Sequence, residues 1–361
     1  MIKTAVIMAG GGGTRFWPVS RMSTPKQLAK LTGDDVMINE TIKHYEGVVG
    51  RENTFIVTNE KQAKLMNEVL YSEVARDHIL IEPVQRNTAP CIIYAAMTLT
   101  KLYGDALMAV LPADHHIANI KEYERILELA FDTAEKTNRI VTIGIKPTFA
   151  STGYGYINFS REAIEGESEV HKLLKFVEKP AEDIAKGYVE SGEYLWNSGM
   201  FIWKASVIID EFKKYLPNTY KLMEGIYDKL RTDDEAKAIE ATYPELDKIS
   251  IDYGIMEKAE GVLCIPGEFG WNDVGSWDAL DDVFDKDDDG NVVVGKHIGV
   301  DTKNTVVFNK GEGSKLITTI GVEGLVIVQT EDTIMVLDKS KAQDVKLMVD
   351  KLKELGREDL L

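Results

Sequence analysis

A glycine-rich segment near the N-terminus combines the residue types that bind phosphate. Gly10–Gly13 follow the apolar run Thr4–Ile7, and Arg15 and Lys26 come soon after them. Glycines let backbone N–H groups approach a phosphate, while arginine and lysine neutralise its charge. The segment has neither the Gly-Lys-Ser/Thr ending of a P-loop nor the last glycine of a dinucleotide fingerprint. It therefore predicts a phosphate-binding glycine turn that carries its own arginine.

Polar side chains follow several later apolar runs. Asp114 stands in "LPADHH" after the fourth such run, and Glu178 and Lys179 stand together in "FVEKP". "EPVQRNTAP" precedes a helical pattern, which predicts Asn87 or Thr88 as the N-cap of that helix. Because an open α/β sheet binds ligands beyond the carboxyl ends of its strands, we expect such residues to face one crevice. "WNSGMFIW" and "FGWNDVGSW" place further polar residues among glycines and tryptophans.

The elements that must position these residues alternate along the chain as far as about residue 290. Predicted strands cover Lys3–Ala9, Thr54–Thr58, His78–Ile81, Leu107–Leu111, Ile140–Ile145, Val170–Val177, Leu195–Trp203 and Gly261–Ile265. Predicted helices cover Met37–Gly47, Lys61–Leu70, Ala89–Leu102, Lys121–Thr137, Ala181–Glu190, Ala205–Tyr215 and Asn218–Glu240. The alternation favours an α/β fold with a Rossmann-like, mostly parallel sheet and helices on both faces.

The residue pattern of the sequence changes from about Asn291. Short β-rich runs such as "NVVVG" and "NTVVFN" are broken by Gly, Asn and Asp, and the charged amphipathic segment Lys341–Leu355 follows them. We therefore predict two domains, a catalytic α/β domain over 1–286 and a small β-rich, β-helix-like domain with a terminal helix over 287–361.

The charge of the chain excludes some classes of partner. Lys and Arg number 42 against 59 Asp and Glu, for a net charge of −17. Binding to nucleic acid or to a membrane surface depends on basic patches, so neither partner is expected. Two cysteines are too few for a disulfide framework. Since the N-terminus lacks a signal-peptide pattern and no apolar run reaches roughly 18 residues, we expect a cytoplasmic protein.

Eight motifs occur in the order and approximate spacing of one known family. They are the glycine loop with Arg15, "WPVSR", "PKQ", "RNTAP", "LPADH", "FVEKP", "WNSGMF" and "GWNDVGSW". In these motifs the chain resembles the mannose-1-phosphate guanylyltransferases, within the sugar-nucleotide pyrophosphorylase superfamily. The resemblance spans Met1 to about Asp282, and the tail also fits. Each motif alone is weak, but eight in sequence are specific.

The resemblance implies a chemistry and a set of site residues. GMP passes from GTP to mannose 1-phosphate with Mg²⁺ (or Mn²⁺), and pyrophosphate leaves after in-line attack at the α-phosphorus. The implied catalytic residues are Arg15, Lys26, Asp114 and Asp273, of which Asp114 and Asp273 hold the metal. The implied nucleotide-binding residues are Ala9, Gly10, Gly11, Gly12, Gly13, Thr14, Arg15, Lys26, Glu82, Asn87, Thr88 and Asp114. The implied sugar-phosphate residues are Tyr154, Gly155, Glu178, Lys179 and Asn197.

Individual roles follow from the same resemblance. Arg15 holds the triphosphate and the leaving pyrophosphate, and Lys26 contacts the α-phosphate. Lys179 contacts the sugar phosphate, while Glu178 and Asn197 bind sugar hydroxyls. Glu82 accepts hydrogen bonds from the guanine edge.

Other classes stay open at this point. One is a different enzyme, either a sugar-1-phosphate nucleotidyltransferase with another base or sugar, or a metal-dependent glycosyltransferase. The other is a regulatory homologue that binds a nucleotide sugar without turnover. The presence of Arg15, Lys26 and both metal carboxylates favours an active enzyme. Longer members of the resembled family carry a further domain that isomerises mannose 6-phosphate with a metal held by His and Glu. Beyond Asp289 the only histidine of this chain is His297, so we expect the transferase activity alone. We also expect a homodimer formed through the C-terminal domain.

Overall fold

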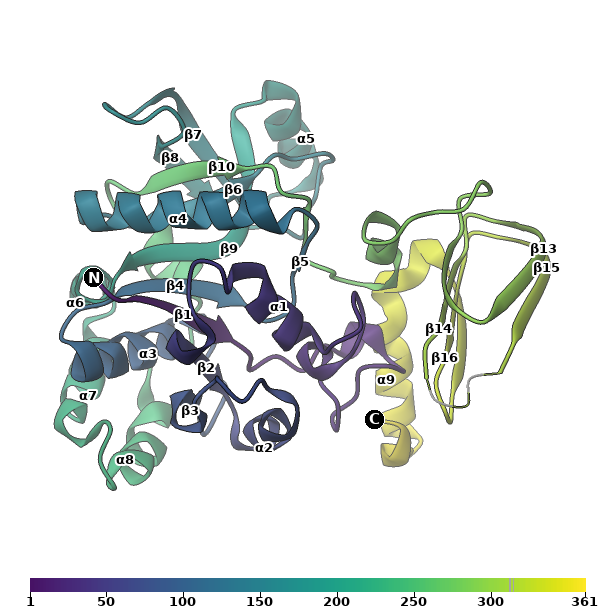
Figure 1. Ribbon diagram of the computed structural model, residues 1–361, viewed down its shortest axis with the longest axis horizontal. Helices are drawn as coiled ribbons and strands as arrows, with labels where there is room; N and C mark the ends of the chain where they lie inside the picture. Colours follow the sequence, from purple (N-terminus) through teal and green to yellow (C-terminus); the bar gives the residue numbers. More distant parts are fainter. Residues whose placement is uncertain (312, 314) are drawn as a thin grey trace. The chain divides into compact units, whose positions relative to one another are not determined.

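The computed structural model describes residues 1–361 except Glu312 and Ser314 (Figure 1). The described chain divides into two units, and each has a hydrophobic core of its own. The first unit comprises Met1–Gly10, Ile42–Ala113 and Asn119–Phe269, and the second comprises Gly11–Thr41, Asp114–Ala118 and Gly270–Leu361. The second unit is thus built from three segments that are distant in the sequence.

The first unit contains a nine-stranded sheet of order β3-β2-β1-β4-β9-β6-β10-β8-β7. Its strands are β1 (Lys3–Met8), β2 (Thr54–Thr58), β3 (Ile79–Ile81), β4 (Leu107–Pro112), β6 (Val141–Ile145), β7 (Tyr156–Ala163), β8 (His171–Val177), β9 (Tyr194–Lys204) and β10 (Leu263–Gly267). All of them run in one direction except β8 and β9. The sheet is therefore mostly parallel, as predicted, although β7 was missed because its Ser, Arg and Glu interrupt the apolar run.

Helices cover both faces of this sheet. Met108 and Val110 of β4 belong to the core that includes α3 and α6, while Ala109 and Leu111 are buried on the opposite face. Figure 1 shows α4 in front of the strands. The helices are α1 (Met37–Tyr45), along which the chain enters the first unit, and α2 (Glu60–Val69), α3 (Thr88–Tyr103), α4 (Ile120–Thr137), α5 (Glu182–Ser191), α6 (Ala205–Tyr215), α7 (Pro217–Glu224) and α8 (Glu235–Thr242).

One helix prediction is wrong. The span Asn218–Glu240 was expected to be continuous, but α7 ends at Glu224 and α8 begins only at Glu235. Gly225 follows α7, and Arg231 adopts a φ of 63°, which a right-handed helix cannot contain. The amphipathic pattern continues across this break, so the pattern alone did not show it.

The C-terminal strands of the second unit form a coil. They are β12 (Val292–Gly295), β13 (His297–Lys303), β14 (Val306–Asn309), β15 (Ile317–Glu323), β16 (Leu325–Gln329) and β17 (Ile334–Asp338), followed by α9 (Val345–Glu354). β12, β14 and β16 pair in parallel, and so do β13 and β15. Since successive strands alternate between two parallel sheets, the chain winds as a short β-helix, and β17 ends it by pairing antiparallel with β16.

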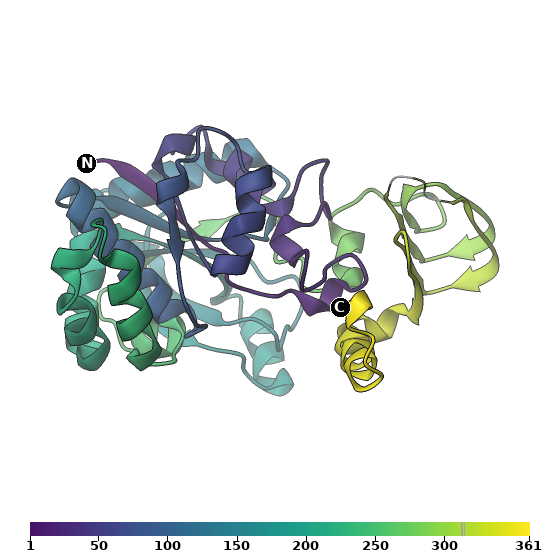
Figure 2. The same cartoon turned by 90° about the horizontal axis from the view of Figure 1, so that it is seen from below.

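The core of the second unit joins its segments. Val306 of β14 and Val345 of α9 pack in the same cluster as Phe16, Trp17 and Trp277. Figures 1 and 2 both show part of the segment Gly11–Thr41, in purple, beside α9, in yellow. The domain boundaries predicted from the sequence, 1–286 and 287–361, stay a prediction. The compact units of the structure are divided differently, because Gly11–Thr41 belongs to the same unit as the C-terminal residues. Among the described residues, no helix is long and apolar enough to cross a membrane.

Candidate active site

The glycine turn is fixed at its last glycine. Gly13 adopts a φ of 60°, and a Cβ atom there would lie 2.3 Å from the Cβ atom of Lys26. Ser20 Oγ donates to the carbonyl of Gly13, and Gln27 Nε2 donates to that of Gly11 at 3.0 Å. The turn therefore lies against the segment that carries Lys26, and this close approach requires glycine at position 13.

Lys26 donates hydrogen bonds to both predicted metal ligands, Asp114 and Asp273, in the second unit. Its side chain is only 7% exposed, and its Nζ donates to Asp114 Oδ2 at 2.8 Å. It also donates to the backbone carbonyls of Asp114 at 3.2 Å and of Asp273 at 3.0 Å. An ammonium has three N–H groups, so protein acceptors take all of them here. Contact with a phosphate, as predicted, requires Lys26 to exchange one of these partners.

A small ladder positions the two carboxylate residues. β5 (His116–Ile117) pairs antiparallel with β11 (Trp271–Asn272), so Asp114 and Asp273 lie near the same end of the ladder. Beside them, Trp271 Nε1 donates to His115 Nδ1 at 3.0 Å. Burial lowers the pKa of His115, which keeps this imidazole neutral and able to accept. The hydrogen bond holds the imidazole beside Asp114.

Asp114 is held in its charged form. Burial raises the pKa of Asp114, but the positive charge of Lys26 and the hydrogen bond from Lys26 outweigh that effect, so the net pKa lies below its ordinary value. The donors available beside it are carboxylate oxygens, which Mg²⁺ prefers together with substrate phosphates. Within the described residues, no group of three or more His, Cys, Asp or Glu could hold a metal ion alone. The pair Asp114 and Asp273 therefore fits a Mg²⁺ ion that a bound substrate helps to hold.

Arg15 is exposed while its chain neighbours Phe16 and Trp17 are buried. Its Nη1 lies 3.4 Å from Oε1 of Gln343, a long contact that leaves most of the guanidinium fork in solvent. The side chain can therefore reach an anionic ligand.

The predicted sugar-side residues gather in the first unit. A Cβ atom on Gly155 would lie 2.5 Å from Glu178 Oε2, and the carbonyl of Gly155 accepts from the backbone N–H of Asn197 at 2.8 Å. Lys179 Nζ contacts Glu178 Oε1 at 2.9 Å, and Lys179 adopts a φ of 43°, which side-chain-bearing residues rarely do. The Tyr154 ring lies edge-on to the buried Trp196, so this tryptophan packs behind the cluster.

Asp252 joins this cluster and was missed from the sequence. Asn197 Nδ2 donates to Asp252 Oδ1 at 3.0 Å, while Asn197 Oδ1 accepts from the backbone N–H of Gly199. Burial, together with the negative charge of Glu178, raises the pKa of Asp252 to about 6. The signal that could have found it is a lone carboxylate in the apolar run "ISIDYGIM", where the helix widens to a π turn of a kind common at functional sites.

Glu82, predicted to bind the guanine edge, lies in the first unit together with the predicted nucleotide-binding residues Asn87 and Thr88. Asn87 caps α3 as predicted, because its Oδ1 accepts from the backbone N–H of Thr88. The hydroxyl of Thr88 accepts from the backbone N–H of Ile251, so it fixes the segment that leads to the missed aspartate. Glu82 is buried, its Oε2 accepts from the hydroxyl of Tyr243, and burial raises its pKa.

Two family models match the chain. The Nucleotidyl transferase model matches residues 4–290, and the MannoseP isomerase/GMP-like beta-helix domain model matches residues 295–352. The chain belongs to the nucleotidyl transferase family. The second match agrees with the coil of parallel strands described above.

Known relatives of this nucleotidyl transferase are similar over nearly its whole length. The alginate biosynthesis protein AlgA of Pseudomonas putida is 40% identical over 356 residues, covering 98% of this chain and 72% of AlgA. The mannose-1-phosphate guanylyltransferase ManC of Salmonella typhimurium is 38% identical over 366 residues, covering 98% and 74%. A crystal structure from Thermus thermophilus, described as a mannose-1-phosphate geranyltransferase, has a TM-score of 0.88 at 32% identity and covers 98% of this chain and 100% of that one.

The two units of this nucleotidyl transferase divide the predicted site residues. The second unit holds Gly11–Arg15 with Lys26, Asp114 and Asp273. The first unit holds the remaining ones, which are Ala9, Gly10, Glu82, Asn87, Thr88, Tyr154, Gly155, Glu178, Lys179 and Asn197. The structure thus brings together the predicted metal and charge residues in one cluster and the predicted sugar residues in another. The fold class predicted from the sequence is confirmed.

Proposed function

We propose that this protein transfers GMP from GTP to mannose 1-phosphate, forming GDP-mannose and pyrophosphate. The observation that carries the proposal is the cluster in which Lys26 joins Asp114 to Asp273. Lys26 contacts the carboxylate of Asp114 and the backbone carbonyl of Asp273. The family motifs assign these three residues to phosphate and metal, which supports the proposal. The relatives named mannose-1-phosphate guanylyltransferase support the choice of GTP and mannose 1-phosphate.

The reaction needs alignment and charge neutralisation more than proton transfer. An oxygen of the sugar phosphate forms a bond to the α-phosphorus of GTP, and the bond from that phosphorus to the bridging oxygen of pyrophosphate breaks. The nucleophile is already an anion, so no general base is required. Arg15 can hold two oxygens of the leaving pyrophosphate with its forked guanidinium, and the backbone of Gly11–Thr14 can approach the phosphates.

Asp114 and Asp273 would hold Mg²⁺ together with the substrate phosphates, and the bound ion would supply electrophilic stabilisation of those phosphates. Mn²⁺ has similar oxygen ligands and can replace it. In the sugar-side cluster, Glu178 accepts hydrogen bonds from sugar hydroxyls, and Asn197 can both accept and donate. Lys179 pairs with the sugar phosphate. Its hydrogen bond with Glu178 raises the pKa of Lys179, which keeps the ammonium charged.

A pyrophosphate-release assay tests this function. Four nucleoside triphosphates are crossed with the 1-phosphates of mannose, glucose and N-acetylglucosamine, with Mg²⁺ present. GTP with mannose 1-phosphate is expected to give the highest kcat/KM. A preference for another base or sugar would make the protein a different pyrophosphorylase. If the protein binds GDP-mannose but releases pyrophosphate with no combination of nucleoside triphosphate and sugar phosphate, it would be a regulatory homologue.

We also propose that two copies of the chain pair through the C-terminal strands and that the enzyme works in the cytoplasm. One side of the β13–β15 pair carries Ile298, Val300 and Ile320, which are 59%, 60% and 76% exposed. Three β-branched apolar side chains on one face support burial against a second copy. Cys91 and Cys264 are both free and buried, which supports a reducing compartment.

A further inference from the structure

The exposed arginine of the glycine segment is carried by the C-terminal core. Phe16 and Trp17, which follow it directly, are 0% and 5% exposed. The Phe16 ring lies 5.0 Å from the ring of Trp277, which in turn lies 5.3 Å from the ring of Phe308 in β14. The glycine turn holds the chain on the N-terminal side of Arg15, and this aromatic row is its anchor on the C-terminal side. The position of Arg15 therefore depends on where this aromatic row is anchored.

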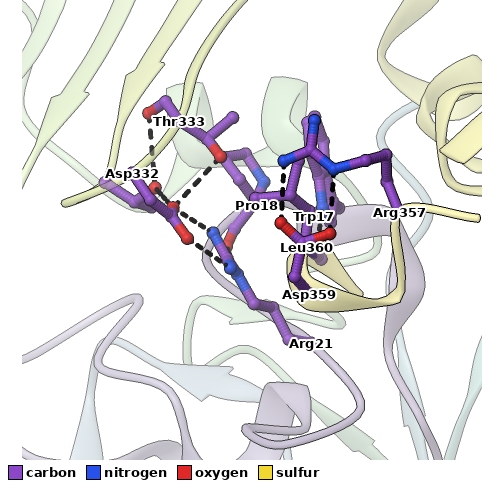
Figure 3. Close-up of polar contacts among 9 residues, drawn as sticks. Trp17, Pro18, Arg21, Asp332, Thr333, Arg357, Asp359 and Leu360 are labelled. Atoms are coloured by element: carbon purple, nitrogen blue, oxygen red, sulfur yellow. Dashed lines mark hydrogen bonds and ion pairs between the residues drawn. The ribbon is translucent and has the colours of Figure 1, made fainter.

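Polar contacts add orientation to that anchor (Figure 3). Trp17 Nε1 donates to the backbone carbonyl of Leu360 at 2.7 Å, and Trp277 Nε1 donates to that of Trp17 at 3.1 Å. Both Nη atoms of Arg21 contact the two carboxylate oxygens of Asp332, one of them at 2.8 Å. A forked pair of this kind fixes the direction of the guanidinium as well as its position.

The pair between Arg21 and Asp332 is built more firmly than an ordinary surface pair. Arg21 is only 15% exposed, and its Nε also donates to the carbonyl of Pro18 at 3.0 Å. The hydroxyls of Thr330 and Thr333 both donate to Asp332. The hydrogen bond from Arg21 holds the pKa of Asp332 well below its usual range. Asp332 is thus a fixed acceptor on the β-helix for the segment that follows Arg15.

Gln343 connects the arginine to the segment that contains the second metal carboxylate. Its Oε1 is the acceptor facing Arg15, and its Nε2 donates to Ser276 Oγ at 2.7 Å. Ser276 lies three residues after Asp273 and is buried. One amide therefore contacts both the arginine and the chain that presents Asp273.

We infer that the β-helix and α9 position Arg15 for catalysis, and that Asp332 and Gln343 are positioning residues for this arginine. The inference rests on the proposed function, because it assigns Arg15 to the triphosphate. Stabilisation of charge in a transition state requires donors that are already in place. Asp332 and Gln343 lie in the C-terminal part of the chain, outside the glycine loop, and their contacts hold the donors of Arg15 in place.

The test compares Asp332→Ala and Gln343→Leu with the native enzyme. We expect kcat to fall about tenfold to a hundredfold, since small displacements of a charged group cost that much, while the KM for mannose 1-phosphate stays within about twofold. Hydrogen exchange of the amides in residues 14–21 should rise in Asp332→Ala. Arg125→Ala is the matched control, because Arg125 makes a forked pair with Glu169 in the first unit, and it should leave kcat unchanged.

A charge swap excludes a general loss of folding. Arg21→Asp combined with Asp332→Arg restores an ion pair of reversed direction, so it should recover part of the kcat lost in Asp332→Ala. Native kcat in Asp332→Ala and Gln343→Leu, or an equal loss in Arg125→Ala, would overturn the inference. Failure of the proposed function looks different: the native enzyme would show no transfer with GTP, while exchange in residues 14–21 would still rise in Asp332→Ala.

Discussion

At the scale of single residues, the two carboxylate clusters differ in their charge state. Asp114 is kept ionised by Lys26, whereas the pKa of Asp252 is raised to about 6 by burial and by Glu178. The first arrangement suits a residue that holds a cation, because its charge is present at every physiological pH. The second suits a hydrogen-bonding position in which the acceptor is shared with Asn197.

The two carboxylates proposed to hold the metal give the first residue-scale prediction. Asp114→Asn and Asp273→Asn should each lower kcat by at least about a hundredfold, or roughly 2.7 kcal/mol of barrier. The fold should survive, because asparagine keeps the size of aspartate and its side-chain oxygen at position 114 can still accept from Lys26. Steady-state kinetics with circular dichroism checks both statements, with the exposed Asp282→Asn as control. Undiminished turnover in excess chelator would contradict the metal assignment.

The raised pKa of Asp252 gives the second residue-scale prediction. The folded protein favours the protonated carboxyl, so its contribution to stability is full below about pH 4 and is lost as the pH rises through about 6. Asn has no charge to bury and keeps an acceptor for Asn197. Asp252→Asn should therefore stabilise the protein at about pH 8 by up to ~3 kcal/mol, and by less at about pH 5.

Urea unfolding at the two pH values measures this difference, with the exposed Asp233→Asn as control. An equal effect of Asp252→Asn at both pH values would show that the carboxyl does not titrate in this range.

At the scale of elements, the glycine turn depends on one backbone conformation. Gly13→Ala would force a side chain into the left-handed region, at roughly 1–2 kcal/mol, and against Lys26. We expect lower stability and a higher KM for GTP, since Lys26 must move. A Cβ atom added to Gly12 would meet no other atom within 4 Å, so Gly12→Ala should leave stability unchanged. Equal urea midpoints for the two variants would refute this account of the turn.

The β13–β15 pair gives the prediction for association. Ile320→Lys places a charge on the apolar face, at its most exposed residue, and should convert the proposed dimer to a monomer. Light scattering after size-exclusion chromatography measures the mass, and Lys303→Ala, on the same strand pair, serves as control. A monomeric native chain would remove the proposal of pairing through this face.

At the scale of the whole molecule, the core of the second unit contains parts of both ends of the chain. A chain limited to residues 1–286 would lose Phe308 and Val345, which pack in one cluster with Phe16, Trp17 and Trp277. Each aromatic side chain left exposed forfeits roughly 1.5–3 kcal/mol of burial. We expect residues 11–41 of this shortened chain to exchange their amide hydrogens freely, and transfer activity to be lost.

The first unit should keep its protection from exchange in the shortened chain, because its core is separate. Full activity of the 1–286 chain would show that the C-terminal core is dispensable for the glycine segment.

The sequence alone determined the local features of this protein. Residues close in the chain set the apolar periods, so α6 was predicted with its observed ends and β2 likewise. The cap at Asn87 follows from neighbouring residues in the same way. The order of the motifs also indicated the nucleotidyl transferase family, which the family model confirms.

Tertiary structure decided which distant residues meet. Trp17 contacts Leu360 across 343 residues, and Asn197 contacts Asp252 across 55. No local pattern reports such contacts, because they depend on how whole elements pack. For the same reason the sequence could assign Lys26 to a phosphate but could not show that Asp114 and Asp273 take its three N–H groups, nor that the C-terminal core carries the glycine segment.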